Sequence, residues 1–243
     1  MSRFFISNDN IKNNIIKISG DDAKHIKNVL RLKKGENLTI CDGNGKDYYC
    51  SIKSFIENEI LLDIISFNKS NTEPKIKVTL FQSLPKSDKM ELIIQKCVEL
   101  GIDEIVPIYT ERSIIKVDKK EKELKKINRW QKISESAAKQ SNRGKIPIIK
   151  PIIKFNTAIE NAKIFENAII AYENEYRYSL KNFLSDFNGK NIALFIGPEG
   201  GFSKDEINLA INNNIVPITL GKRILRTETA AFSALSIIMY ELD

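Results

Sequence analysis

The chain has 243 residues, of which 42% are hydrophobic and 28% charged, and its formal net charge is +7 at pH 7. This length can bury a full core and suits one large domain or two small ones, of which two is the preferred interpretation. The composition is that of an ordinary soluble protein without a membrane-spanning run, and the N-terminus turns polar at Ser7, short of a secretory apolar region. We therefore expect a cytoplasmic protein that does not associate with membranes.

Cysteine and histidine are too sparse to support a metal site. Cys41, Cys50 and Cys97 are an odd number without paired short spacing, and His25 is the only histidine. Neither a disulfide framework nor a zinc site fits this pattern. We expect no metal and no Ser/His/Asp mechanism.

Residues 1–73 are predicted to form a small β-rich domain that resembles a closed barrel. Asp21 or Asp22 can cap one helix, whose face would carry Ala23, Ile26, Val29 and Leu30 before Gly35. The polar segment 67–74 ends in proline and marks the domain boundary. The predicted strands are 3–6, 15–18, 37–42, 47–56 and 60–67, with a hairpin turn at 42–45.

Residues 74–243 form the second predicted domain, in which strands alternate with helices. Alternation of this kind favours an α/β fold with a parallel sheet and helices on both faces. The expected elements are strand 76–84, helix 87–100 closed by Gly101, strand 104–109, helix 120–141, strands 167–172 and 191–196, helix 203–213, strand 215–220 and helix 228–241.

Positive charge is concentrated in one part of the chain. Residues 112–154 contain 14 Lys and Arg against 4 Asp and Glu, a net of +10, which leaves the rest at −3. A polyanion-binding surface requires such a patch, although a lysine run on a helix is often only a solvated face. The less mixed continuation favours RNA: it holds Lys139, Arg143, Lys145, Lys150 and Lys154.

Two loops carry the clearest functional signal. Residues 195–203 read Phe-Ile-Gly-Pro-Glu-Gly-Gly-Phe-Ser, and residues 220–230 read Leu-Gly-Lys-Arg-Ile-Leu-Arg-Thr-Glu-Thr-Ala. In each, an apolar strand runs into a stretch with an exposed main chain, and a helix follows. In parallel sheets, ligands bind beyond the carboxyl ends of the strands, so we expect both loops to face one small molecule.

The first loop does not match a phosphate-binding pattern. It lacks the Lys-Ser/Thr of a Walker motif and the three spaced glycines of a dinucleotide site, and it places Glu199 where an anion would approach. A carboxylate there suits an uncharged or cationic ligand, such as the sulfonium of S-adenosylmethionine. Alternatively, Glu199 accepts backbone hydrogen bonds at the start of a helix that Ser203 caps.

The second loop offers an apolar slot, Leu220-Gly221 and Ile224-Leu225, in which backbone groups can read an adenine ring. The alternative is a plain turn between a strand and a helix. Arg226 follows the slot, where it either projects toward a reacting base or forms a salt bridge, and Thr227 can cap the next helix. That helix is apolar on nearly all sides, so it needs both the core and a second subunit to cover it.

These loops and four further motifs resemble the RsmE family of 16S ribosomal RNA uracil-N3 methyltransferases. The resemblance runs nearly end to end, and Asn142 stands where many relatives have glycine, a change that Asn tolerates because it adopts left-handed geometry. The additional motifs are residues 91–101, Glu111-Arg112-Ser113, residues 136–143 and residues 25–31.

The resemblance implies a PUA-like N-terminal barrel, a SPOUT domain with a deep trefoil knot and a homodimer joined through the C-terminal helix region. It implies that S-adenosylmethionine is the cofactor and that 16S ribosomal RNA of the small subunit is the substrate. Pattern analysis alone predicts the α/β sheet but not the knot. The implied cofactor residues are Tyr172, Glu173, Ile196, Gly197, Pro198, Glu199, Gly200, Gly201, Leu220, Gly221, Ile224 and Leu225. The residues expected near RNA are His25, Lys27, Arg31, Arg112, Lys139, Arg143 and Lys145.

Methylation of uridine at N3 requires the imide proton to leave. A guanidinium near O2 or O4 stabilises the resulting anion, and we assign this function to Arg226. Glu228 or Glu199 is a candidate proton acceptor, although Glu228 also suits the first turn of its helix electrostatically. Two alternatives are a non-catalytic RNA-binding or assembly factor with the same fold and an α/β enzyme that uses another nucleotide cofactor.

Overall fold

The computed structural model describes residues 3–6, 8–113 and 120–243. Contacts divide the chain into two compact units, Met1–Glu73 with Ala138–Ile146, and Pro74–Ala137 with Pro147–Asp243. The sequence did not predict that segment 138–146 belongs with the first unit. Glu73 explains the grouping, because its carboxylate accepts hydrogen bonds from the Arg143 guanidinium at 2.6 Å and from the backbone N–H groups of Gly144 and Lys145 at 2.8 and 3.1 Å.

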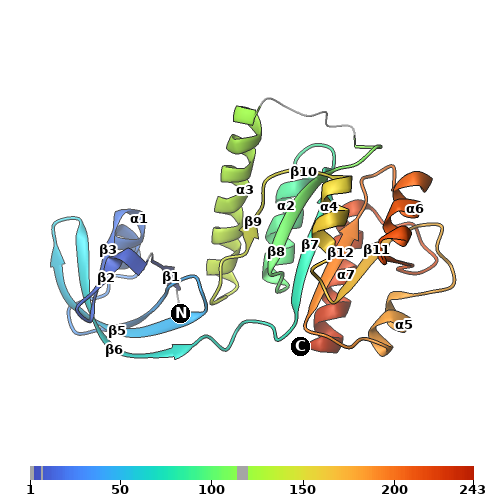
Figure 1. Cartoon of the computed structure of the whole chain (residues 1–243). Helices are drawn as coiled ribbons and strands as arrows, with labels where there is room; N and C mark the ends of the chain where they lie inside the picture. The colour runs from blue at the N-terminus through green and yellow to red at the C-terminus, as the bar shows by residue number, and fades with distance from the viewer. Residues whose placement is uncertain (1–2, 7, 114–119) are drawn as a thin grey trace. The chain divides into compact units, whose positions relative to one another are not determined.

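The first unit is built on one six-stranded sheet with the order β1-β4-β5-β6-β3-β2, which curls around its core (Figure 1). β1 pairs with β4 in parallel and the other pairs are antiparallel. Among the described residues the end strands β1 and β2 do not pair with each other. The elements are β1 (Phe4–Phe5), η1 (Asn8–Asn10), β2 (Ile11–Lys12), β3 (Ile15–Ser19), α1 (Gly20–Lys24), η2 (His25–Val29), β4 (Asn37–Cys41), β5 (Lys46–Ile56) and β6 (Glu59–Lys69).

The predicted hairpin turn between β4 and β5 is confirmed. The Asp42 carboxylate accepts hydrogen bonds from the N–H groups of Asn44 at 2.8 Å and Lys46 at 3.1 Å. Gly43 and Gly45 adopt φ angles of 72° and 94°, which glycine adopts without strain. Local hydrogen bonding and glycine geometry therefore place this turn.

The predicted helix in this unit is irregular, and it is not capped by Asp21 or Asp22, because Ser19 is its N-cap residue. α1 spans five residues and continues as the π-helical segment η2. Ala23 and Ile26 are buried as predicted, whereas Val29 is 66% exposed. A π-turn contains more residues than an α-turn, so it rotates later side chains away from the face that a 3.6-residue period predicts.

The second unit contains a seven-stranded sheet with the order β10-β8-β7-β12-β11-β13, in which β9 also pairs with β8 and all pairs are parallel. The elements are β7 (Lys77–Ser83), α2 (Lys89–Glu99), β8 (Glu104–Tyr109), α3 (Lys120–Gln140), β9 (Ile148–Ile149), β10 (Ile153–Lys154), α4 (Phe155–Ala162), β11 (Asn167–Ala171), α5 (Leu180–Ser185), β12 (Asn191–Ile196), α6 (Lys204–Asn212), β13 (Val216–Ile218) and α7 (Thr227–Leu242).

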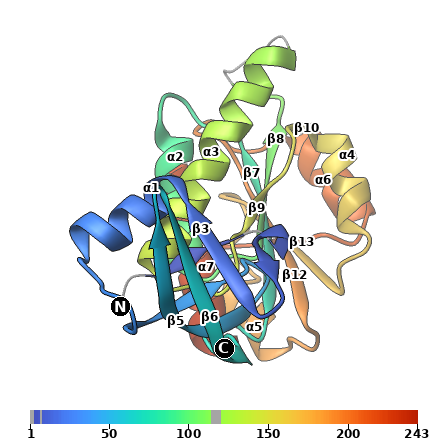
Figure 2. The same ribbon diagram turned by 90° about the vertical axis from the view of Figure 1, so that its left-hand side faces the viewer.

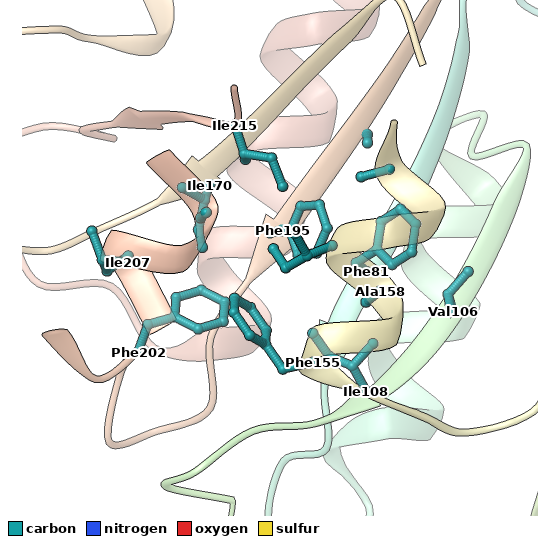
Figure 3. Close-up of a cluster of buried hydrophobic side chains, with 14 residues drawn as sticks. Phe81, Val106, Ile108, Phe155, Ala158, Ile170, Phe195, Phe202, Ile207 and Ile215 are labelled. Atoms are coloured by element: carbon teal, nitrogen blue, oxygen red, sulfur yellow. The ribbon is translucent and has the colours of Figure 1, made fainter. Parts of the chain in front are cut away.

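Helices cover both faces of this parallel sheet. α4 and α6 lie on one face, and α2 packs with α7 on the other (Figure 2). On the α4 face, the ring of Phe81 stacks on that of Phe195 with centroids 4.4 Å apart, and Phe155 lies between Phe195 and Phe202 (Figure 3). Phe202 belongs to the loop between β12 and α6, and its side chain is buried in this core. Phe202 therefore anchors the loop.

Four short elements of the second unit, β9, β10, α4 and α5, were not predicted from the sequence, nor were η1 and β2 of the first unit. β9 and β10 have two residues each, and Pro147 and Pro151 interrupt the pattern around them. α4 is eight residues long, which is too short for a strong periodic signal. In the described part of the chain, no helix combines the length and apolar character needed to cross a membrane.

Candidate active site

Three loops leave the carboxyl ends of the neighbouring strands β11, β12 and β13. β11 pairs in parallel with both β12 and β13, so the segments after Ala171, Ile196 and Ile218 emerge on the same edge of the sheet. They line a cavity of about 420 Å³, which we call the loop pocket. Its wall consists of residues 171–173, 176, 196–201, 219–227 and 230.

The loop pocket brings together all of the residues predicted to bind the cofactor. Arg226 also lines it, whereas Glu228 is not among the described lining residues. The two loops singled out in the sequence therefore face one cavity. The predicted residues in its wall are Tyr172, Glu173, Ile196, Gly197, Pro198, Glu199, Gly200, Gly201, Leu220, Gly221, Ile224 and Leu225.

Close approach explains the glycines in the loop after β12. A Cβ atom on Gly201 would collide with the Glu173 carboxylate, and its φ of 68° also disfavours a side chain. A Cβ on Gly197 would lie 3.2 Å from the ring of Phe202. The main chain of this loop is thus pressed between the β11 loop and the core.

A capping box fixes the exit of the same loop. As predicted, the Ser203 side chain caps α6, and the Glu206 carboxylate accepts the Ser203 N–H at 2.9 Å. Glu206, only 8% exposed, also accepts the N–H of Glu111 at 2.8 Å. The neighbouring Arg112 donates to the Gly200 carbonyl at 2.8 Å. Arg112, expected near RNA, therefore lies directly against the loop that borders the pocket.

Glu199 is held by residues from the start of α2. Its carboxylate accepts the Lys86 N–H at 3.1 Å and lies 3.1 Å from the Lys89 ammonium, which also lies 3.2 Å from Glu228. Burial raises the pKa of Glu199, but hydrogen bonds from its own N–H, Lys89 and Lys86 outweigh this effect, so the pKa is below its usual value. The lowered pKa makes the Glu199 carboxylate a poor base near neutral pH.

Arg226 itself occupies the N-cap position of α7 and is exposed. The prediction that Thr227 caps this helix is wrong, because the Thr227 hydroxyl donates to the Gly197 carbonyl at 2.6 Å. This hydroxyl also accepts from the Gln82 amide at 3.0 Å. Neither Thr227 nor Gln82 was singled out as a functional residue, since no local motif signals a bond across 145 residues.

The residues expected near RNA in the first unit differ in their surroundings. His25 packs edge-on against Phe4 with ring centroids 5.8 Å apart, while Lys27 and Arg31 are exposed. Lys139 forms an ion pair with Asp22 at 3.3 Å. Arg143 does not lie on the surface: its side chain is 4% exposed, because it pairs with Glu73, and Lys145 donates its N–H to the same carboxylate.

One face of α3 was not singled out in the sequence although it carries several cations. Its residues line a shallow groove of about 450 Å³, opposite the buried side chains of Trp130 and Ser134. The sequence signal that could have identified this face is the spacing of Lys125, Arg129 and Lys132 by four, three and seven residues, which places their side chains on one side of a helix. The groove is lined by Lys125, Asn128, Arg129, Lys132, Ile133 and Ser136.

The cysteines offer no reactive thiol. All three are buried, and burial raises the pKa of Cys41 and Cys50 to about 12 and raises that of Cys97 as well. Within residues 3–6, 8–113 and 120–243 no group of three His, Cys, Asp or Glu side chains is arranged to hold a metal ion.

Known proteins match both units. The family model described as RNA methyltransferase domain matches residues 72–239, and the model described as RNA methyltransferase PUA domain matches residues 18–65. The ribosomal RNA small subunit methyltransferase E of Bacillus subtilis is 35% identical over 234 residues, which cover 93% of this chain and 90% of the relative. The protein of the same name from Mesomycoplasma hyopneumoniae is 36% identical, with 97% and 98% covered.

A solved structure has the same fold. Ribosomal RNA small subunit methyltransferase E from Neisseria gonorrhoeae, bound to S-adenosyl methionine, superposes with a TM-score of 0.84 at 31% identity and covers 99% of this chain and 97% of that one. The predicted α/β fold with an N-terminal PUA-like domain is confirmed, whereas the SPOUT class and the knot stay predictions. The sequence matches likewise confirm the predicted RNA methyltransferase. The chain belongs to the ribosomal RNA small subunit methyltransferase E family.

Proposed function

We propose that the loop pocket binds S-adenosylmethionine and that the chain methylates N3 of a uridine in 16S ribosomal RNA of the small subunit. The observation that carries this proposal is the convergence of both predicted loops on one cavity of about 420 Å³. This volume is within the range of small-molecule sites, roughly 300–1,000 Å³. Family membership supports this catalytic interpretation over a non-catalytic RNA-binding factor.

The chemistry of the wall fits this cofactor. Leu220, Ile224 and Leu225 offer apolar contacts for an adenine ring, and Ile224 is 89% exposed although it is large and apolar. The wall carries the acidic residues Glu173 and Glu199 as well as basic ones, so it is not a purely cationic phosphate site. S-adenosylmethionine supplies an electrophilic methyl group on a positively charged sulfur.

We propose that Arg226 contacts the target base. Its guanidinium is permanently charged, and it borders the cavity at the N-terminus of α7. Near O2 or O4 it would stabilise the anion left when the N3 proton departs. Lys89 forms ion pairs with both Glu199 and Glu228. We therefore propose that water accepts the N3 proton and that Glu228 helps to position the start of α7.

We propose that the substrate RNA contacts cations of both units. Lys27, Arg31, Lys139, Lys145 and His25 belong to the first unit. Arg112 and the cationic face of α3 belong to the second. Arg143 would act indirectly, because its guanidinium holds segment 138–146 through Glu73.

We further propose a homodimer formed through α7 and the adjoining α2. Ile237 and Tyr240 of α7 are 43% and 87% exposed, and Leu92 of α2 is 43% exposed. Light scattering tests this directly: the wild-type protein should have twice the chain mass and Ile237→Asp the mass of one chain. A wild-type protein with the mass of one chain would contradict it.

Thermal unfolding tests the cofactor assignment. A ligand that binds only the folded state raises the midpoint of unfolding by mass action. S-adenosylhomocysteine should raise the midpoint, whereas NAD and ATP at the same concentration should not. Stabilisation by NAD or ATP alone would favour the alternative nucleotide-dependent enzyme.

A further inference from the structure

Three segments of the second unit meet in a cluster of polar side chains behind the loop pocket. The end of β7 and the start of α2 contribute Gln82 and Lys89. The loop after β12 contributes Gly197 and Glu199, and the first turn of α7 contributes Thr227 and Glu228. We call these six residues the polar junction.

The first link of the polar junction is a directional chain of hydrogen bonds. The Gly197 carbonyl can only accept, so the Thr227 hydroxyl donates to it at 2.6 Å and its oxygen must accept from the Gln82 amide at 3.0 Å. The Gln82 amide also donates to the Ser83 carbonyl at 2.9 Å. Both N–H groups of Gln82 are therefore used, and the orientation of the Gly197 peptide is fixed relative to α7.

The second link joins the same three segments through charge. The ammonium of Lys89 lies 3.1 Å from Glu199 and 3.2 Å from Glu228, the latter at ion-pair distance but outside hydrogen-bond geometry. The Lys86 N–H adds a hydrogen bond to Glu199. Without the Lys89 ammonium, the carboxylates of Glu199 and Glu228 would repel each other with no positive charge between them.

We propose that Gln82 and Lys89 are positioning residues that hold the loop after β12 and the start of α7 at the separation needed to bind the methyl donor. This inference rests on the proposed function. Gln82 is fully buried, and neither residue is among those described as lining the cavity. Both would act through Gly197, Glu199 and Thr227, which do line it.

A substitution of Gln82 can distinguish a positioning function from a general contribution to stability. Its amide oxygen is buried and has no hydrogen-bond partner within the described residues. An unpaired buried oxygen is unfavourable, so Gln82→Leu removes this cost together with the amide donors. The midpoint of thermal unfolding should therefore change little, whereas the loop after β12 loses its link.

The first test measures S-adenosylhomocysteine affinity by calorimetry and amide hydrogen exchange of residues 197–201 in the free protein. Gln82→Leu and Thr227→Val should each weaken binding about tenfold and accelerate exchange, and the double variant should be no worse than either single one. Thr227→Ser keeps the hydroxyl and should retain the wild-type affinity and exchange rate. Thr229→Val, an exposed site on the same helix, is the matched control.

The second test removes the charge of Lys89. Lys89→Met should weaken binding about tenfold, and adding Glu228→Gln should recover most of the loss, because the repulsion is relieved. Lys96→Met, which breaks an ion pair with Glu99 within α2, is the control and should bind like the wild type.

Unchanged affinity and unchanged exchange in Gln82→Leu and Lys89→Met would overturn the proposal. Additive losses within the first link would also overturn it, since they would show that Gln82 and Thr227 act separately. A wild-type protein that does not bind S-adenosylhomocysteine, while the variants still exchange faster, would refute the proposed function and leave the polar junction supported.

Discussion

Arg226 shares its charge and its place in the pocket wall with Lys222 and Arg223, but it differs from them in lying at the N-cap of α7. It borders the loop pocket, is exposed, and caps α7 with its backbone only, so its side chain makes no capping hydrogen bond. The nearby carboxylates Glu199 and Glu228 are both held by Lys89. Electrostatic activation of the base by Arg226 is therefore the chemistry that the site supports best.

Substitution of Arg226 should separate cofactor binding from chemistry. Arg226→Ala should bind S-adenosylhomocysteine within about threefold of wild type, but its single-turnover rate of methyl transfer should fall by roughly 100-fold or more. Arg177→Ala, which removes an exposed arginine outside the predicted site, should leave the rate unchanged. A wild-type rate in Arg226→Ala would remove this residue from the mechanism.

The Lys89 ion pairs should make stability depend on pH in a defined direction. The pKa of Glu199 is lowered in the folded protein, so its contribution is complete above its unfolded pKa and is lost as the pH falls through the folded value. Hydrogen bonding to Glu199, opposed by burial, raises the pKa of Lys89, whose contribution is lost only as the pH rises through its folded value.

The pH prediction is tested by urea denaturation of wild type and Lys89→Met. The difference in unfolding free energy should be constant around neutral pH and should shrink in acid as Glu199 becomes protonated. Lys96→Met provides the baseline for an ion pair within one helix. An equal difference at pH 3 and pH 7 would contradict the assignment.

Segment 138–146 shows how one buried ion pair organises an element. Arg143 and Glu73 are 4% and 20% exposed, and Glu73 also accepts two backbone N–H groups. Asn142, directly before Arg143, adopts a φ of 58°, the left-handed geometry expected when Asn replaces glycine here. The turn and the ion pair together attach this segment to the first unit.

Two Arg–Glu pairs of the chain should therefore differ in their contribution to stability. Arg143→Met removes the charged partner of the half-buried Glu73 carboxylate and should lower the unfolding free energy by about 3 kcal/mol, at the lower end for a buried pair. Arg129→Met breaks the pair with Glu91, in which the arginine side chain is 67% exposed, and should cost at most about 1 kcal/mol. Similar losses measured by chemical denaturation would contradict this view of Arg143.

The cationic face of α3 should contribute to RNA affinity through phosphates. Replacing Lys125, Arg129 and Lys132 with Gln should flatten the slope of log affinity against log salt by about two. The control carries the same charge change on exposed lysines elsewhere in the second unit: Lys163, Lys181 and Lys204. A slope that changes equally in both variants would show that α3 acts only through net charge.

At the scale of the whole molecule, the sequence predicted the features that have local causes. The alternation of apolar strands and helices predicted the parallel sheet, and Gly197, Gly201 and Ser203 predicted a loop that opens into α6. The meeting of the two loops in one cavity followed from the rule that ligands bind at the carboxyl ends of parallel strands.

What the sequence did not predict depends on contacts between distant residues. Gln82 and Thr227 are 145 positions apart, and Arg143 meets Glu73 across 70, so no local pattern indicates either bond. The π-helical turn η2 moves Val29 off the predicted helix face, and a 3.6-residue periodicity cannot reveal such a turn. The trefoil knot depends on the path of the whole chain and remains an implication of the family.

The measurement that tests the central claim most directly uses S-adenosylmethionine with a deuterated methyl group. The protein is incubated with this donor and small subunits that lack the modification, and the nucleosides of the 16S ribosomal RNA are analysed by mass spectrometry. We predict N3-methyluridine that carries the deuterated methyl group, and far less of it at the same reaction time when Arg226→Ala replaces the wild type. Label in another nucleoside, or no label with a protein that binds the donor, would contradict this prediction.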